Sequence, residues 1–263
     1  MTDPAAHLLS LYDEQLRTDA ETPSALEVTR HGPLRLVTFR GGRGFVTYRD
    51  LGGADGGSVR RMVADVVAHY RAIPGITRIE WKARGHDHAP ELHEALLENG
   101  FLAQETESIM VGEASSLLTD VPLPAGVSLR QVSEEHEVRA LSAMQDETFG
   151  DPVSDEMANA LLVRLALQDG MQLWVAEAGG QFVGAGRIEP VAGTDFAGIW
   201  AGAVLPRWRG RGIYRALTST RARSALEMGK SLVNSDSSAL SRPILERSGL
   251  VAVSTTTPYL LRI

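Results

Sequence analysis

The chain has 263 residues, of which 43% are hydrophobic and 22% charged, so the composition supports a packed core and excludes a disordered chain. Its formal net charge is −7 at pH 7, which argues against general nucleic-acid binding because such binding needs a basic face. Cysteine is absent, which excludes disulfide scaffolds, thiolate metal sites and cysteine nucleophiles.

The N-terminal segment predicts an amphipathic surface helix, because Leu8, Leu11, Tyr12 and Leu16 recur at helical spacing. The segment does not resemble a signal peptide, because it has acidic residues where a signal peptide has basic ones. No segment approaches the roughly 20 apolar residues of a membrane helix. We therefore expect a cytoplasmic protein that does not bind membranes.

The first half of the chain alternates predicted strands and helices. Strands are expected over 34–40, 44–51, 78–83 and 101–113, and helices over 59–73 and 90–100. A segment over 113–126 interrupts this pattern, because Pro122 and Pro124 prevent a helix. We place the domain boundaries there: a first domain over 1–115, a linker over 116–125 and a second domain over 126–263.

The second half has a similar order of elements. Strands are expected over 127–132, 172–178, 182–191, 198–206, 231–236, 250–253 and 255–263, and helices over 133–149, 153–168, 213–228 and 241–249. The segments ALLENGFLA (95–103) and ILERSGLVA (244–252) align without a gap, each after a strand and a long helix. This similarity predicts an internal repeat and two α/β domains, each a mixed sheet flanked by helices.

The histidines restrict the chemistry of the second half, because none of the seven lies beyond His136. A Ser-His-Asp triad or a His-ligated metal there would need residues from the first half. In the first half, His86, Asp87, His88 and His93 form a cluster. We interpret that cluster as a helix N-terminal region and expect no metal site.

An arginine- and glycine-rich turn opens the helix predicted at 213. Six arginines lie in this region without an acidic residue between Phe196 and Leu226: Arg207, Arg209, Arg211, Arg215, Arg221 and Arg223. A helix N-terminus carries partial positive charge and unpaired N–H groups, and Gly210 and Gly212 leave those groups accessible. The pattern predicts a phosphate cradle; the alternatives are a solvated helix start and a nucleic-acid patch.

The order strand, Pro-x-x-Arg-Gly-x-Gly, helix resembles the coenzyme A signature of the GNAT-type N-acetyltransferase superfamily. Arg209 and Gly212 match the signature, but its last position, usually a small residue, is occupied by Tyr214. In a second register, Arg207, Gly210 and Gly212 also fit the signature. The resemblance covers 126–263. The first domain resembles a degenerate tandem copy, since its equivalent stretch RDLGGADGGS contains two aspartates that would repel phosphate.

The resemblance implies a site for acetyl-CoA between the strands over 198–206 and 231–236, which should part to admit the pantetheine arm. It assigns cofactor binding to these residues: Ala203, Val204, Arg209, Gly210, Arg211, Gly212, Ile213, Tyr214, Ser238 and Ser241. For Ser238 and Ser241, ordinary helix capping before Pro243 is the alternative.

The acceptor amine must lose a proton, and without a local histidine we expect a carboxylate base. Glu189 is the first choice and Asp195 the second, while Asp146 and Glu147 are placed to attract a cationic acceptor; each is alternatively a solvated charge. The position of the family's usual general acid, a tyrosine, corresponds to Leu245. Tyr259 or Tyr214 then supplies the hydroxyl, or the thiolate leaves unaided.

The resulting hypothesis is an acetyl-CoA-dependent N-acetyltransferase in which an amine attacks the acetyl group directly. The alternatives are a non-catalytic acyl-CoA-binding or sensing module and an interaction scaffold with a vestigial cradle. We expect acetyl-CoA and an amine acceptor as partners, neither nucleic acid nor membrane, and a monomer or homodimer.

Overall fold

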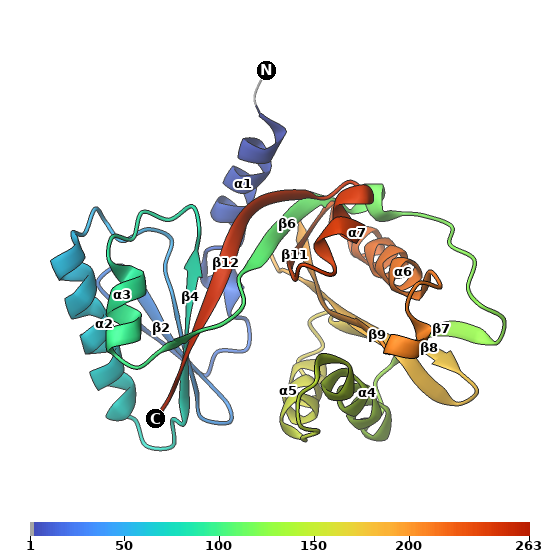
Figure 1. Ribbon diagram of the computed structural model, residues 1–263, viewed down its shortest axis with the longest axis horizontal. Helices are drawn as coiled ribbons and strands as arrows, with labels where there is room; N and C mark the ends of the chain where they lie inside the picture. The colour runs from blue at the N-terminus through green and yellow to red at the C-terminus, as the bar shows by residue number, and fades with distance from the viewer. Residues whose placement is uncertain (1–2) are drawn as a thin grey trace. The chain divides into compact units, whose positions relative to one another are not determined.

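The computed structural model describes residues 3–263 and has a mixed α/β fold in two compact units (Figure 1). The first unit contains the described residues up to Ile109, with 236–239 and 252–263, and the second contains 110–235 and 240–251. The predicted fold class, mixed sheets flanked by helices, is confirmed. Within residues 3–263, none of the helices combines the length and the hydrophobicity needed to cross a membrane.

The sheet of the first unit has the strand order β1-β2-β3-β4-β12, with β5 beside β12. Its strands are β1 (Glu27–His31), β2 (Leu34–Phe39), β3 (Arg43–Thr47), β4 (Arg78–Arg84), β5 (Leu102–Ala103) and β12 (Val251–Arg262). Its helices are α1 (Pro4–Gln15), α2 (Gly56–Arg71) and α3 (Leu92–Glu98), with a short 3₁₀ turn, η1 (Asp19–Glu21). The strand β3 runs parallel to β4, and the other pairs are antiparallel.

The core of the first unit lies between α2 and the sheet. The valines at 59, 63, 66 and 67 recur at helical spacing on α2 and are buried with Tyr70 in the same cluster as Val46, Ile79 and Trp81. The hydroxyl of Tyr70 donates to Val37 O and Phe45 O at 2.9 and 3.0 Å, so α2 is also tied to the backbone of β2 and β3. The sequence analysis missed β1 because its residues, EVTRH, are mostly polar and exposed.

The sheet of the second unit has the order β6-β11-β10-β9-β8-β7. Its strands are β6 (Glu107–Glu113), β7 (Val127–Val132), β8 (Gln172–Ala178), β9 (Gln181–Pro190), β10 (Phe196–Val204) and β11 (Leu232–Ser237). Its helices are α4 (Glu135–Phe149), α5 (Glu156–Leu165), α6 (Ile213–Glu227) and α7 (Arg242–Arg247), with 3₁₀ turns η2 (Ala114–Leu117) and η3 (Pro206–Trp208). The residues of β8 alternate between two clusters, with Leu173 and Val175 in the one that holds α4 and α5, and Ala176 in the one that holds α6. The helices therefore cover both faces of this sheet.

Each unit completes its sheet with a strand from the other half of the sequence. Residues 256–262 of β12 pair antiparallel with β4, and Tyr259 and Leu261 join the core of the first unit. The C-terminal part of β6, from Met110, belongs to the second unit, where Ala114 N donates to Ser231 O at 2.8 Å. The boundaries predicted from the sequence put 252–263 in the second domain, whereas the structure places these residues in the first unit. A hydrophobic pattern predicts a strand but does not identify its partner.

The ends of α3 and α7 have the same geometry. Phe101 N donates to Leu96 O at 3.0 Å, and Leu250 N donates to Leu245 O at 3.1 Å. The intervening glycines, Gly100 and Gly249, have φ angles of 86° and 100°, which favour glycine. This likeness supports the predicted repeat, while the assignment of the first unit as a degenerate copy remains a prediction.

Candidate functional site

The strands β10 and β11 part after a short parallel pairing. Their register runs from Phe196 with Leu232 to Gly198 with Asn234, whereas β10 continues beside β9 to Val204. The end of β10 therefore has a sheet neighbour on one side and an open edge on the other. An opening at this place was expected from the sequence.

A bulge interrupts β10 along that open edge. The register with β9 shifts between Trp200 and Ala203, so that Ala201 and Gly202 together oppose one residue of β9. Ala201 has a φ of 49°, an uncommon left-handed conformation for a residue with a side chain. Such a conformation persists only where the surrounding structure holds it.

The backbone groups of Ala203 and Val204, the residues predicted to bind the pantetheine arm, point to opposite sides of β10. Leu205 N donates to Val183 O at 3.0 Å, and hydrogen bonding alternates along an antiparallel pair. Ala203 therefore directs its backbone groups toward β9, where it pairs with Ala185, and Val204 directs its N–H and C=O toward the open edge. Arg209 Nε donates to Val204 O at 3.1 Å.

Two buried side chains hold the carbonyl groups of the bulge. Arg221 on α6 is 1% exposed, and one terminal nitrogen donates to Trp200 O at 3.2 Å and Arg187 O at 3.4 Å. Gln145 on α4 donates to Ala201 O at 2.6 Å from the opposite face. With these carbonyls bound, the outward backbone groups of the bulge keep a fixed direction.

Arg221 differs from the other arginines of this region. Its remaining nitrogens donate to Leu217 O and Thr218 Oγ1 at 3.1 and 3.2 Å, so its hydrogen-bond partners are neutral oxygens. Burial lowers the pKa of this guanidinium. The sequence predicts Arg221 in the positive field of the cradle, whereas the structure buries it beneath the bulge. Gly186 is the sequence signal for this, since a Cβ there would lie 2.6 Å from the guanidinium.

The predicted cradle lies directly after β10. The chain passes through η3, then Gly210 and Gly212 with φ angles of 74° and 82°, and α6 begins at Ile213. No side chain caps the N-terminus of α6 and its first turn contains no acidic residue, so its N–H groups are available to an anion. Five arginines of the segment are exposed to solvent: Arg207, Arg209, Arg211, Arg215 and Arg223.

The two cradle glycines are needed for different reasons. A Cβ at Gly210 would meet nothing within 4 Å, whereas one at Gly212 would lie 2.7 Å from Cγ1 of Val121 in the linker. The linker is fixed to α6 by Ser219, whose hydroxyl accepts from Thr119 N and donates to Thr119 O, both at 3.0 Å. The linker therefore borders the cradle, which the sequence did not reveal.

In the first unit, the N-terminus of α2 is capped by the side chain of Asp55. Asp55 Oδ1 accepts from Ser58 N at 2.8 Å. The hydrogen bonds with Ser58 lower the pKa of Asp55. A carboxylate at this position repels a second anion, whereas the start of α6 has no side-chain cap.

Tyr214 lies beside the bulge. A Cβ at Gly202 would be 2.8 Å from the tyrosine ring, and the side chain hydrogen-bonds with Ser241. Thr218 Oγ1 donates to the backbone O of Tyr214 at 2.8 Å. Burial raises the pKa of Tyr214, against the smaller effects of Arg221 and these hydrogen bonds, so the hydroxyl is protonated at neutral pH. Ser241 is the N-cap residue of α7, but its side chain makes no capping hydrogen bond. Its side chain contacts Tyr214, so helix capping does not account for this serine.

Each candidate base either lies away from the bulge or has its carboxylate bound to other groups. Glu189 pairs in register with Gly198, about 10 Å along the strand from Ala201. Its carboxylate accepts from Arg187 Nε at 2.5 Å and from Arg164 at 3.3 Å. Asp195 is exposed in the loop before β10, and Asp146 accepts from Ser154 N at 3.0 Å at the end of α4. Glu147, beside Asp146, is exposed to solvent.

The structure places Tyr259 in the core of the first unit. It pairs with Trp81 on β4, and its hydroxyl lies 2.8 Å from His93 Nδ1. Ser238 also belongs to the first unit, in the segment 236–239, whereas Ser241 belongs to the second. Tyr259 is therefore not among the residues packed around the cradle, because the exchange of β12 carries it into the other sheet.

The histidine cluster is engaged in hydrogen bonds. His86 Nε2 lies 3.1 Å from Asp13 Oδ1, and its Nδ1 lies 2.7 Å from Ser254 Oγ. Among residues 3–263, no three histidine, aspartate or glutamate side chains are grouped so that they could hold a metal ion.

Comparisons with known proteins match a segment of the second unit to one family. The model of the acetyltransferase (GNAT) family matches residues 138–241. The uncharacterized N-acetyltransferase YjgM of Escherichia coli K12 is 36% identical over 114 residues, which are 43% of this chain and 63% of YjgM. The aligned segment thus spans less than two thirds of that relative.

Solved structures show the same fold over nearly the whole chain. A GCN5-related N-acetyltransferase from Kribbella flavida superposes with a TM-score of 0.67 at 17% identity, covering 98% of this chain and 96% of its own. A tandem GNAT protein of the clavulanic acid biosynthesis pathway gives 0.60 at 12% identity, covering 100% and 97%. Residues 138–241, which hold the bulge, the cradle and α6, are therefore an acetyltransferase domain of the GNAT family.

Proposed function

We propose that this protein is an N-acetyltransferase that moves an acetyl group from acetyl-CoA to an amine by direct attack. The observation that carries the proposal is that three features follow one another along β10 and the start of α6. An open edge and a bulge at Ala201 lead into the uncapped, arginine-rich start of α6. Together they offer aligned donors for an acyl carbonyl and for a diphosphate.

The residues of the second unit fit the cosubstrate. The amides from Arg209 to Tyr214 are proposed to hold the pyrophosphate, with Gly210 and Gly212 giving the turn its shape. Val204 directs its N–H to the open edge, and Ala203 fixes that direction by pairing with β9. Ser241 borders the same space through Tyr214, and Ser238 remains a predicted contact. When bound, acetyl-CoA supplies the activated thioester, and an N–H at this edge can stabilise the oxyanion.

We propose Tyr214, in place of Tyr259, as the hydroxyl that protonates the leaving thiolate. Leu245, at the position of the family's usual tyrosine, is fully buried and has no proton to give. Tyr214 contacts the bulge and keeps its proton at neutral pH, because burial raises its pKa. A protonated hydroxyl beside the bulge is the form that a general acid requires.

The general base must remove a proton from the acceptor amine. Removing a proton at pH 7 from an amine with a pKa near 10.4 costs about 4.6 kcal/mol. Glu189 stays our predicted base, acting through water, although it must give up an ion pair with Arg187 or Arg164 to accept a proton. The acceptor, a cytoplasmic location and a monomer or homodimer also stay predictions.

A non-catalytic acyl-CoA sensor is the second candidate, and the replacement of the usual tyrosine by Leu245 favours it. Calorimetric titration with acetyl-CoA, followed by an assay of free thiol release against a panel of amines, distinguishes the two. An acetyltransferase binds acetyl-CoA and releases thiol only when an acceptor is added. Binding without acceptor-dependent release supports the sensor, and no binding contradicts both.

A further inference from the structure

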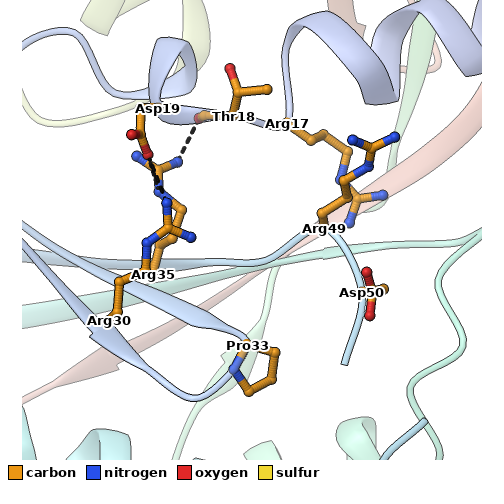
Figure 2. Close-up of a pocket in the computed structure, with 8 residues that line it drawn as sticks. All are labelled: Arg17, Thr18, Asp19, Arg30, Pro33, Arg35, Arg49 and Asp50. Carbon is orange, nitrogen blue, oxygen red and sulfur yellow. Dashed lines mark hydrogen bonds and ion pairs between the residues drawn. The ribbon is translucent and has the colours of Figure 1, made fainter. Parts of the chain in front are cut away.

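A cavity in the first unit lies outside everything described above. Its volume is about 410 Å³, and Figure 2 shows the side chains that surround it. Three segments contribute them: the end of α1 with η1, the hairpin of β1 and β2, and the end of β3. The lining residues are Arg17, Thr18, Asp19, Arg30, Pro33, Arg35, Arg49 and Asp50.

The lining concentrates positive charge within an acidic chain. Four arginines face two aspartates here, although the net charge of the protein is −7. Arg30 and Arg35 share one carboxylate oxygen, Asp19 Oδ1, which lies 3.1 Å from a nitrogen of each. Arg49 is exposed and makes no ion pair or hydrogen bond with the rest of the described chain. Arg17 is paired with Asp13 and Asp87 outside the lining, so the guanidinium charge in excess is that of Arg49 and of Arg30 and Arg35 over Asp19.

Two of the guanidinium groups are fixed in place before any ligand binds. Arg17 is 5% exposed, and its terminal nitrogens donate to both oxygens of Asp87 at 2.7 and 2.9 Å. Arg35 is equally buried and donates to Thr18 O at 2.6 Å and Thr22 Oγ1 at 3.0 Å. Because these side chains are already ordered, an anion that contacts them would not pay their conformational entropy.

One nitrogen of each buried arginine has no hydrogen-bond partner and is closed to solvent, so it adds positive charge beside the cavity but no donor to it. The Nε atoms of Arg17 and Arg35 are buried and make no hydrogen bond. The Nε of Arg35 is near Asp19 Oδ1 but lacks hydrogen-bond geometry, so the contact is electrostatic only. Figure 2 shows Arg30 and Arg35 beside Asp19, and Arg17 and Arg49 together on the other side of the cavity. Positive groups thus surround the space instead of forming one flat patch.

The aspartates leave room for an anion. Asp19 is drawn toward Arg30 and Arg35, and Asp50 Oδ1 accepts from the backbone N of Gly52 at 2.7 Å. The volume exceeds that of a phosphate ion and lies at the small end of ligand pockets. No aromatic side chain lines it, so nothing is present on which a nucleobase would stack.

We propose that this cavity binds a small phosphomonoester, with its phosphate held by Arg30, Arg35 and Arg49 beside the fixed guanidinium of Arg17. Guanidinium groups that approach from several directions match the tetrahedral distribution of phosphate oxygens. The site is separate from the cradle on α6 and does not depend on the proposed acetyl transfer.

The test is calorimetric titration of the whole protein with glycerol 3-phosphate, at an ionic strength held constant with chloride. The double variant Arg30→Gln/Arg49→Gln removes two exposed charges and should weaken binding by about tenfold or more. Arg71→Gln, an equal change of an exposed residue on α2, serves as the control and should bind like the unchanged protein. Binding to the cradle would persist in all three proteins and is thereby distinguished.

Three results would overturn the proposal. The first is equal affinity of the double variant and the control, and the second is no binding by the unchanged protein. The third is tighter binding of citrate than of glycerol 3-phosphate, which would assign the cavity to carboxylates. A single conservative variant, Arg49→Lys, should retain part of the affinity, because it keeps the charge but loses the planar pair of donors. Equal unfolding midpoints for all variants would confirm that the fold is intact.

Discussion

At the scale of single residues, the unusual feature is a buried guanidinium among neutral acceptors. Arg221 bonds to carbonyl oxygens on both strands that meet at the bulge, and Gly186 and Gly202 make room for it. Burying a charge without a counter-ion is unfavourable, so its many hydrogen bonds are required to keep it in place. This arrangement links the shape of the bulge to one side chain.

We expect Arg221→Met to lower the free energy of unfolding of the second unit by about 2–4 kcal/mol, since it leaves several buried carbonyls without donors. Affinity for acetyl-CoA should fall as well, because the bulge loses its support. Urea denaturation and calorimetry measure the two effects. Arg223→Met, an exposed change on the same helix, is the matched control, and equal behaviour of the two variants would refute the assigned role.

The two candidate acids give opposite expectations. Tyr214→Phe should lower kcat by about 10- to 100-fold at nearly unchanged acetyl-CoA affinity, because it removes the proton donor but keeps the ring against Gly202. Tyr259→Phe removes a hydroxyl that bonds to His93 and should leave kcat unchanged. Steady-state kinetics on both variants decide the matter, and the reverse order of effects would contradict the placement of the acid.

At the scale of elements, the starts of α2 and α6 explain why one unit carries the candidate site. The N-terminus of α2 is capped by Asp55, whereas that of α6 follows Gly212 and has no side-chain cap. This difference could be predicted from the sequence, because residue type alone determines whether a carboxylate occupies a helix start. The strands and helices around the cradle could also be predicted from the sequence, because hydrophobic periodicity and turn residues are local signals.

The remaining parts of the site needed the three-dimensional structure. Nothing in the spacing of Gln145 or Arg221 shows that both reach the carbonyls of one bulge. The polar strand β1 gave no alternation, and Val121 reaches Gly212 only through the path of the linker. Contacts between residues far apart in sequence depend on packing, which a local pattern does not encode.

At the scale of the whole molecule, the exchange of β6 and β12 makes each sheet depend on both halves of the chain. The strand β12 pairs with β4 through seven residues, from Thr256 to Arg262, although it ends the half that carries the cradle. Neither 1–115 nor 126–263 alone contains a complete sheet. The two halves should therefore fold only when joined.

Removal of residues 252–263 should destabilise the first unit, because β4 loses its antiparallel partner and Tyr259 and Leu261 leave the core. Hydrogen exchange should rise in β3, β4 and α2 more than in β8 and β9. A deletion of the same kind that removes only Ile263, an exposed residue, serves as the control. Faster exchange confined to the second unit would show that β12 stabilises the unit to which the sequence assigned it.

The central claim is that the amides at the start of α6 hold a diphosphate, and a matched pair of substitutions at Gly210 tests it most directly. Asn and Asp both tolerate a positive φ, and a Cβ there meets nothing within 4 Å, so both variants should fold. Calorimetry should show that Gly210→Asn binds acetyl-CoA within about threefold of the unchanged protein, whereas Gly210→Asp loses about 100-fold through charge repulsion. Equal affinity of the two variants would place the cofactor elsewhere and contradict the account.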